Sequence, residues 1–220
     1  MVVAKFISVA VIGYLMGAIP FALIISKRVA KVDISKHGSG NIGGTNVLRV
    51  LGFKAGALVM ALDLAKGFIP VLLANFIIGD SLLTINGFAL NWLWGQVIVA
   101  LMVMVGHNWS VYIKFRGGKG VAAYYGSWFA IWPLVALGGG VILILTVWLS
   151  KHMSLGSILG SFAILCLFMV LTAANVSSPV YLIYSLVAAA LIVYQHRRNI
   201  SRLQAGTENR MDQKRTHTDL

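Results

Sequence analysis

The segment 38–49 reads GSGNIGGTNVLR and combines glycines with short polar side chains and one arginine. Glycines let backbone N–H groups converge on one point, and Arg49 can hold a phosphate through two parallel hydrogen bonds. The short polar side chains that can add hydrogen bonds are Ser39, Asn41, Thr45 and Asn46. The residue types therefore predict a phosphate-binding loop; the alternative is a flexible connection between two helices.

The same segment contains the pattern G-x-G-x-x-G, beginning at Gly38. A dinucleotide-binding fold needs a strand before this pattern and a βαβ unit around it. Here a long apolar run precedes the glycines and another follows them. The pattern therefore does not indicate a nucleotide site.

A second glycine-rich segment, 114–120, reads KFRGGKG and leads into an apolar run that we expect to be helical. The free N–H groups and the dipole of a helix start favour an anion, and Lys119 adds a positive charge. The segment is not a Walker A loop, because Gly120 stands where that loop needs Ser or Thr. It predicts an anion site built by the backbone of Gly117, Gly118 and Gly120, with a lysine-rich turn at a membrane surface as the alternative.

In each of two polar pairs the two residues are three positions apart, so they share one face of a helix. Asp63 and Lys66 fall inside an apolar run, where charged groups line a site or pair with each other, and we favour a structural ion pair. His196 and Asn199 lie at the end of the last apolar run. A lone histidine at such a boundary is more often structural, so the spacing by itself assigns it no catalysis.

The composition indicates which solvent surrounds these segments. Of 220 residues, 59% are hydrophobic and 11% are charged, with a mean hydropathy of +0.85. This is too little polar surface for a soluble domain and favours a lipid bilayer. The net charge of +12 is confined to a few segments between apolar runs, which is typical of cytoplasmic loops and argues against nucleic-acid binding. Cys166 is the single cysteine, so the chain has no intrachain disulfide and no cysteine cluster for a metal.

The apolar runs define the predicted architecture. Runs that can cross a membrane lie at 6–25, 55–78, 87–105, 154–174 and 179–195, while 121–149 is either one tilted span or two short ones. A break of 121–149 at the glycines 138–140 places every basic segment on one side, whereas an unbroken span does not. The sequence therefore predicts an all-α integral membrane fold of seven transmembrane helices, with the N-terminus outside and the C-terminus cytoplasmic. We expect one domain, 1–203, followed by a loose polar cytoplasmic tail, 204–220.

In these segments the chain resembles the bacterial acyl-phosphate-dependent glycerol-3-phosphate acyltransferases, which are integral membrane enzymes. The family patterns that it matches in order are GSGNxGATNVLR…DxxKG at 38–67, GHxxPVFxxFKGGKGVAT at 106–123, SLAS at 154–157 and HxENIxRLxxGxE at 196–208. The resemblance extends over residues 10–208. Arg198 departs from the family, because it occupies a position that is generally acidic there.

The resemblance implies a reaction and a location. A fatty acyl group would pass from acyl phosphate to the sn-1 hydroxyl of glycerol 3-phosphate, giving lysophosphatidic acid and phosphate. The enzyme would need no cofactor and no metal, and its partners would be these two substrates and membrane lipids. The active site would face the cytoplasm from the cell (inner) membrane.

The resemblance also assigns roles to residues. Ser39, Arg49 and Lys119 would hold the glycerol phosphate, with Asn41, Thr45 and Asn46 as further substrate-binding residues. The backbone of Gly117, Gly118 and Gly120 would hold the acyl phosphate. Ser157 would complete the site, and His196, Asn199 and Lys119 would be the catalytic residues.

Two observations bear on rival functions. None of the five histidines has an aspartate five positions further on, so the HxxxxD arrangement of thioester-using acyltransferases is missing. The alternative function is a membrane transporter of a phosphorylated solute, which would distribute charges through its spans. Here the polar segments gather on one predicted face, which favours the enzyme.

Overall fold

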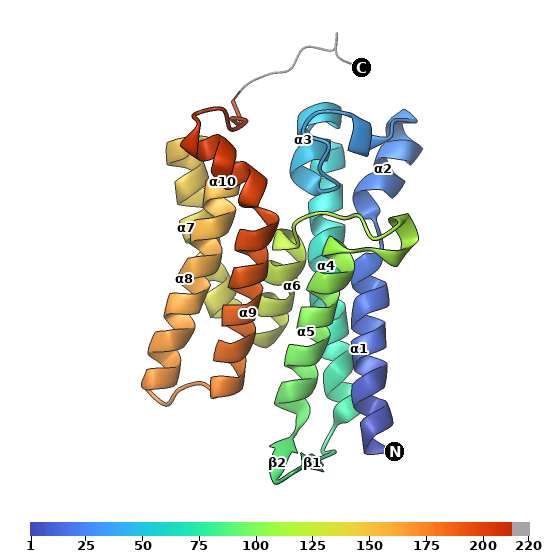
Figure 1. Ribbon diagram of the computed structural model, residues 1–220, viewed down its shortest axis with the longest axis vertical. Coiled ribbons are helices and arrows are strands. Elements are labelled where there is room, and N and C mark those ends of the chain that lie inside the picture. The colour runs from blue at the N-terminus through green and yellow to red at the C-terminus, as the bar shows by residue number, and fades with distance from the viewer. Residues whose placement is uncertain (213–220) are drawn as a thin grey trace.

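The computed structural model describes residues 1–212, and most of them are helical (Figure 1). Helix is the expected outcome for these apolar runs, because a bilayer offers no hydrogen-bond partner to an exposed peptide group. In chain order the elements are α1 (Val2–Ala18), α2 (Phe21–Ala30), the 3-10 helix η1 (Ile34–Lys36), α3 (Gly44–Leu51), α4 (Phe53–Ile78), β1 (Leu83–Ile85), β2 (Phe88–Leu90), α5 (Trp92–Asn108), the 3-10 helix η2 (Val111–Ile113), α6 (Val121–Ile131), α7 (Pro133–Ser150), α8 (Met153–Ala173), α9 (Pro179–Gln195) and α10 (Arg197–Gln204).

Several of these helices have the length and composition of membrane spans. Within the described residues, four segments qualify outright: Val2–Ala30, which comprises α1 and α2, and the helices α4, α7 and α8. The pair α9 and α10, bent by 59°, makes a fifth if it counts as one span, and α5 is apolar but shorter. The helical membrane class predicted from the sequence is therefore confirmed. The antiparallel hairpin of β1 and β2 was not predicted, and it pairs Leu83 with Leu90.

The break in the long apolar run 121–149 differs from the prediction. We expected it at the glycines 138–140, but α6 ends at Ile131 and α7 begins at Pro133, with Trp132 between them. Proline has no N–H to continue a helix, and it is well suited to the first turn of the next one. The glycines stay helical within α7. In a membrane, small residues serve close helix contact, and a side chain at Gly139 would overlap Ile164 of α8.

Close contacts also fix α6 against α4. A Cβ atom at Gly67 of α4 would overlap the carbonyl oxygen of Ala123, and one at Gly126 of α6 would overlap that of Leu64. The two backbones therefore approach each other through a pair of glycines. A polar chain joins α4, α5 and α9: Gln96 donates to Asn75 Oδ1 at 2.8 Å, and Tyr181 donates to Gln96 Oε1 at 2.5 Å.

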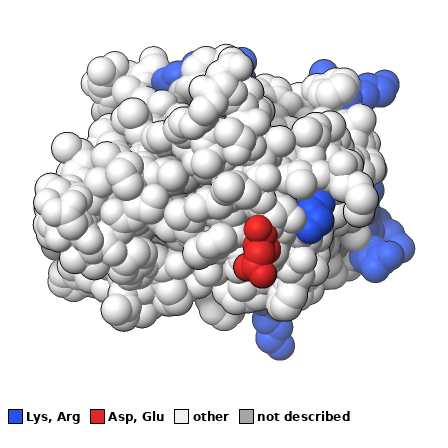
Figure 2. All heavy atoms as spheres, turned by 90° about the horizontal axis from the view of Figure 1, so that it is seen from below, with Lys and Arg blue, Asp and Glu red and all other residues white. Residues whose placement is uncertain are grey.

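The two ends of the bundle differ in charge. The N-terminus and the β-hairpin lie at one end, and α2, α3 and α10 lie at the other (Figure 1). Seen from the hairpin end, most of the surface is uncharged; acidic and basic side chains lie next to each other within this face, and further basic side chains lie at its edge (Figure 2). Lys5 belongs to this end, where it donates to Ser81 Oγ at 2.7 Å. The glycine-rich segments and most of the basic residues therefore share the opposite end.

Candidate functional site

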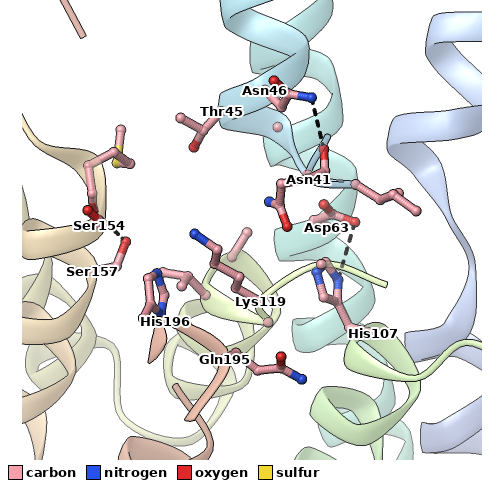
Figure 3. A pocket seen from close by; sticks show the side chains of 18 of the residues that line it. Asn41, Thr45, Asn46, Asp63, His107, Lys119, Ser154, Ser157, Gln195 and His196 are labelled. Atoms are coloured by element: carbon pink, nitrogen blue, oxygen red, sulfur yellow. Dashed lines mark hydrogen bonds and ion pairs between the residues drawn. The ribbon is translucent and has the colours of Figure 1, made fainter. Parts of the chain in front are cut away.

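A cavity of about 1130 Å³ opens between the charged ends of the helices and continues down between α6 and α7. Every residue that the sequence analysis assigned to the site lines it: Ser39, Asn41, Thr45, Asn46, Arg49, Gly117, Gly118, Lys119, Gly120, Ser157, His196 and Asn199. Figure 3 places the side chains of Thr45, Lys119, Ser157 and His196 around one space. The structure thus brings together segments that are up to 160 positions apart, from Ser39 to Asn199.

The loop before α3 is shaped by Asn46, which is 1% exposed. Its side-chain oxygen accepts from the N–H of Ser39 at 2.9 Å, and its amide nitrogen donates to the carbonyl oxygens of His37 at 2.9 Å and Asn41 at 3.1 Å. These bonds occupy the Asn46 amide, so it organises the loop instead of presenting free donors. The first turns of α3 present Thr45 and Arg49 to the cavity, four residues apart on one helix face.

The second glycine-rich segment forms a tight turn before α6. Gly118 donates its N–H to the carbonyl oxygen of His107 at 3.1 Å, and a side chain at Gly117 would overlap that same oxygen. Gly120 has a φ of +78° and precedes the first residue of α6, Val121. The first N–H groups of a helix have no partner within it, and here they begin at the cavity. This geometry suits an anion, as the sequence predicted.

A chain of hydrogen bonds crosses the cavity from this turn. Lys119 Nζ donates to Asn199 Oδ1 at 2.6 Å, and Asn199 Nδ2 donates to Glu208 Oε1 at 2.5 Å. Glu208 also accepts from Ser154 Oγ at 2.8 Å and from Arg202 Nε at 2.7 Å. An ammonium has three donors, so Lys119 keeps donors for a ligand after its bond to Asn199.

Glu208 was missing from the predicted site residues, although it lines the cavity and is 9% exposed. The sequence contained the information to include Glu208, because it is one of only six acidic residues and it is the last residue of the last family pattern. The tail from Gln204 was expected to be loose, but its described part, up to Asp212, folds back and Met211 donates to the carbonyl oxygen of Lys151 at 2.8 Å. The bonds of Glu208 hold this segment. Residues 213–220 of the predicted tail lie outside the described residues.

Burial and neighbouring charges set the ionisation of this chain. The pKa of Lys119 is lowered to about 8, chiefly by burial; the charge of Glu208 opposes this shift, and the charges of Arg202 and Arg49 add to it. Burial alone would raise the pKa of Glu208, but the hydrogen bonds from Asn199, Arg202 and Ser154 lower it below its usual value. Glu208 is therefore a carboxylate at neutral pH, and Lys119 is an ammonium that loses its proton at mildly alkaline pH.

His196 is 2% exposed at the junction of α9 and α10. Its Nδ1 lies 2.8 Å from the carbonyl oxygen of Ile192. A carbonyl oxygen only accepts hydrogen bonds, so Nδ1 carries a proton and Nε2 of a neutral ring is an acceptor. Ser157 donates to the carbonyl oxygen of Met153 at 2.8 Å, which leaves its oxygen lone pairs for other partners.

Asp63 and Lys66 form the predicted ion pair, with Lys66 Nζ 2.9 Å from Asp63 Oδ1. Lys66 Nζ also donates to the carbonyl oxygen of Ile19 at 2.9 Å. Both side chains are 4% exposed. The pair joins α4 to the end of α1, so the predicted ion pair is confirmed, and Asp63 also lines the cavity.

Comparison with known proteins adds to this geometry. The family model described as glycerol-3-phosphate acyltransferase matches residues 7–206. The chain is 43% identical to glycerol-3-phosphate acyltransferase 3 of Dehalococcoides mccartyi (strain ATCC BAA-2266 / KCTC 15142 / 195), over 97% of this chain and 99% of the relative. It is 44% identical to glycerol-3-phosphate acyltransferase of Thermoanaerobacter pseudethanolicus (strain ATCC 33223 / 39E), over 93% and 95%. The chain belongs to the glycerol-3-phosphate acyltransferase family.

Solved structures agree with this assignment. The glycerol 3-phosphate form of PlsY (YgiH), an integral membrane glycerol 3-phosphate acyltransferase, superimposes with a TM-score of 0.80 at 37% identity, over 93% of this chain and 94% of that one. The lysophosphatidic acid form gives a TM-score of 0.78 at 38% identity with the same coverage. The protein is therefore an integral membrane acyltransferase of phospholipid synthesis. The substrate contacts of its individual residues stay predictions.

We predict that Glu208→Gln lowers both the stability and the turnover of this glycerol-3-phosphate acyltransferase. A hydrogen bond to a charged group contributes about 1.5–3 kcal/mol, and the substitution removes the charge that accepts three of them. Thermal unfolding in detergent and the rate of acyl transfer measure the two effects. Asp212→Asn is the control, because Asp212 pairs with Arg210 where both side chains are about half exposed. Wild-type stability and rate in Glu208→Gln would contradict the importance of this carboxylate.

Proposed function

We propose that this acyltransferase takes its acyl group from acyl phosphate and transfers it to the sn-1 hydroxyl of glycerol 3-phosphate. The products are lysophosphatidic acid and phosphate. The observation that carries the proposal is the presence of two anion-binding elements in one cavity, the turn before α6 and the pair Arg49 and Lys119. Further support comes from the forms in which PlsY was solved, with glycerol 3-phosphate and with lysophosphatidic acid.

The chemistry of the donor fits such a site. Acyl phosphate is a mixed anhydride, so its carbonyl carbon is already activated and phosphate is a good leaving group. The hydroxyl oxygen forms a bond to the carbonyl carbon, and the bond from that carbon to the phosphate oxygen breaks. The site then has to position two phosphates and stabilise developing negative charge, which backbone N–H groups and buried cations do well.

Each predicted residue has a role in this scheme. Arg49, Ser39 and Lys119 hold the phosphate of glycerol 3-phosphate, and Thr45 and Asn41 add hydrogen bonds. The backbone of Gly117, Gly118 and Gly120 holds the phosphate of the donor, while Asn46 keeps the first loop in shape. Asn199 orients Lys119, and Ser157 lies on the opposite wall. Two groups can accept the proton of the attacking hydroxyl: Nε2 of His196 and a substrate phosphate.

The proposal includes seven membrane spans, with the N-terminus outside and the C-terminus in the cytoplasm. The helices that would span are α1, α4, α5, α6, α7, α8 and α9, which run alternately up and down in Figure 1. At about 1.5 Å per residue, the 11 residues of α6 cover only about 16 Å, roughly half of the hydrocarbon core. The concentration of basic residues at the end that carries α2, α3 and α10 supports a cytoplasmic position for the cavity, at the inner membrane.

This topology predicts the outcome of labelling with a membrane-impermeant thiol reagent. Single cysteines introduced into Cys166→Ala protein at exposed Lys36 and Lys114 should be protected in intact cells and react after permeabilisation. A cysteine at exposed Asn86, in the hairpin, should react in intact cells and serves as the control. Labelling of position 36 or 114 in intact cells would reverse the orientation.

The donor prediction is tested with purified protein, glycerol 3-phosphate and either palmitoyl phosphate or palmitoyl-CoA. We expect lysophosphatidic acid from the acyl phosphate alone. A thioester has no phosphate on its acyl carbon, so it offers no anion to the turn at Gly117–Gly120. Equal turnover with palmitoyl-CoA would refute the role of this turn, while the acyltransferase activity would still stand.

We expect Lys119→Ala to lower kcat/KM by about 10²–10³-fold, as the loss of a preorganised charge stabiliser does. In the wild type, kcat/KM should fall as the pH rises through about 8, because the Lys119 ammonium then loses its proton. Lys119→Arg should move this alkaline limit upward, because an arginine stays charged. The same limit in Lys119→Arg and the wild type would assign the titration to another group.

A further inference from the structure

Four exposed cations surround the entrance of the cavity. Lys36 ends η1, Arg116 precedes the turn at Gly117–Gly120, and Arg197 and Arg198 begin α10. All four line the cavity and are exposed to solvent, and we call them the rim. The fold therefore gathers positive charge from three segments of the chain at the place where the cavity meets water.

Within the described residues, no exposed carboxylate lines the cavity beside these cations. The two acidic side chains that line it, Asp63 and Glu208, are 3% and 9% exposed, and each is paired with a cation that is not part of the rim. Asp33 lies close to Lys36 but does not line the cavity, and its carboxylate accepts two hydrogen bonds from Ser35. The rim therefore presents net positive charge to the solution.

Arg197 shows how a rim charge is held in place. Its guanidinium lies over the ring of Tyr194, 4.3 Å from the ring centroid, and its Nη1 donates to the carbonyl oxygen of Tyr194 at 2.9 Å. Both partners are neutral, so these contacts fix the position of the cation and leave its charge uncompensated. Lys119, in contrast, bonds to Asn199 inside the cavity. The rim can thus act on an approaching anion through its field, before the contacts of the site form.

The two substrates reach the cavity by different routes. An acyl phosphate carries a fatty chain and is held in the membrane, whereas glycerol 3-phosphate is a small dianion that arrives from water. Anionic lipids give the cytoplasmic leaflet a negative surface potential, which depletes a dianion at the surface by about tenfold relative to the bulk solution. A site that opens at this surface therefore has little acceptor in front of it unless the protein opposes the field.

We propose that the rim opposes the negative potential of the membrane surface and so concentrates glycerol 3-phosphate at the entrance of the cavity. The inference rests on the proposed function, because it requires this acceptor and a cavity that faces the cytoplasm. Three cations about 10 Å from a dianion raise its local concentration by about fivefold at about 0.1 M salt. This gain is of the same order as the depletion that the lipids cause, so the two fields largely cancel.

The test begins with a variant that removes charge from the rim and leaves the site intact. It combines Lys36→Gln, Arg116→Gln and Arg198→Gln, and it keeps Arg197, whose side chain also packs on Tyr194. None of the three substituted side chains has a role in the proposed transfer. The variant should therefore change the supply of acceptor and leave the chemical step as it is.

The matched control removes the same number of charges from another part of the cytoplasmic end. It combines Lys27→Gln, Arg28→Gln and Lys31→Gln, which are exposed cations of α2 and its C-cap and do not line the cavity. Helix α2 lies at the edge of the bundle away from α10 (Figure 1). Charges more than a Debye length from the entrance are screened, so this variant should have the KM of the wild type.

The measurement is KM for glycerol 3-phosphate with saturating palmitoyl phosphate, in nanodiscs of phosphatidylcholine alone or with half of it replaced by phosphatidylglycerol. At about 0.1 M salt the rim variant should show a KM about fivefold above that of the wild type, at unchanged kcat, and at about 0.5 M salt the difference should fall below about twofold. Phosphatidylglycerol should raise KM in all three proteins, and salt should remove this effect as well. KM and kcat separate acceptor supply from damage to the site, and KM does not depend on the folded fraction.

A salt-sensitive rise of KM in the rim variant alone would support the inference. An unchanged KM, an equal rise in the α2 control, a rise that persists at high salt, or a KM that ignores phosphatidylglycerol would each overturn it and leave the proposed function standing. If the rim variant does not accumulate, Arg198→Glu decides, with an expected rise of about threefold against none in Arg28→Glu. Wild-type protein that transfers no palmitoyl group to glycerol 3-phosphate would overturn the proposed function and the inference with it.

Discussion

The carboxylate of Glu208 is the group on which the arrangement of the site depends. It accepts hydrogen bonds from Ser154 at the start of α8 and from Asn199 and Arg202 on α10. Asn199 in turn holds Lys119, which the chain delivers from the other side of the cavity. One negative charge therefore connects three segments and compensates the cations around it. In a protein with six acidic residues and eighteen basic ones, few groups are available for this task.

Contacts between the other helices hold α6 and α4 in place around this carboxylate. Glycine contacts lock α6 against α4, and the ion pair of Asp63 with Lys66 joins α4 to the end of α1. The start of α6, and with it the turn at Gly117–Gly120, is therefore fixed relative to α3 and Arg49. The irregular backbone of the turn at Gly117–Gly120 is tolerated near the membrane because it lines a cavity, where water or substrate can satisfy its N–H groups. Rigid helices position the anion site, and short loops form it.

Part of the site was predictable because the residue types of the two glycine-rich segments are those that bind anions. Glycines beside Arg49 and Lys119 predicted anion binding, and the residues of these two segments line one cavity, whereas Ser157, His196 and Asn199 were assigned from the family resemblance. The helical membrane class followed from composition. The break near Trp132 was placed wrongly, because glycines were expected to interrupt a helix that proline interrupts instead. Neither the organising bonds of Asn46 nor the burial of Glu208 could be derived, since both depend on partners that only the folded chain brings within reach.

The shortness of α6 has a consequence for the membrane as a whole. Its 11 residues span about half of the hydrocarbon core, so the part of the cavity beside it lies within a single leaflet. Leu137 and Val141 line the cavity and are each 53% exposed on α7, so a lipid product formed there can enter that same leaflet without passage through water. Synthesis of this kind enlarges one monolayer and leaves the other unchanged. A growing cell therefore has to move lipid across the bilayer at a matching rate, or its membrane will curve toward the side that receives no new molecules.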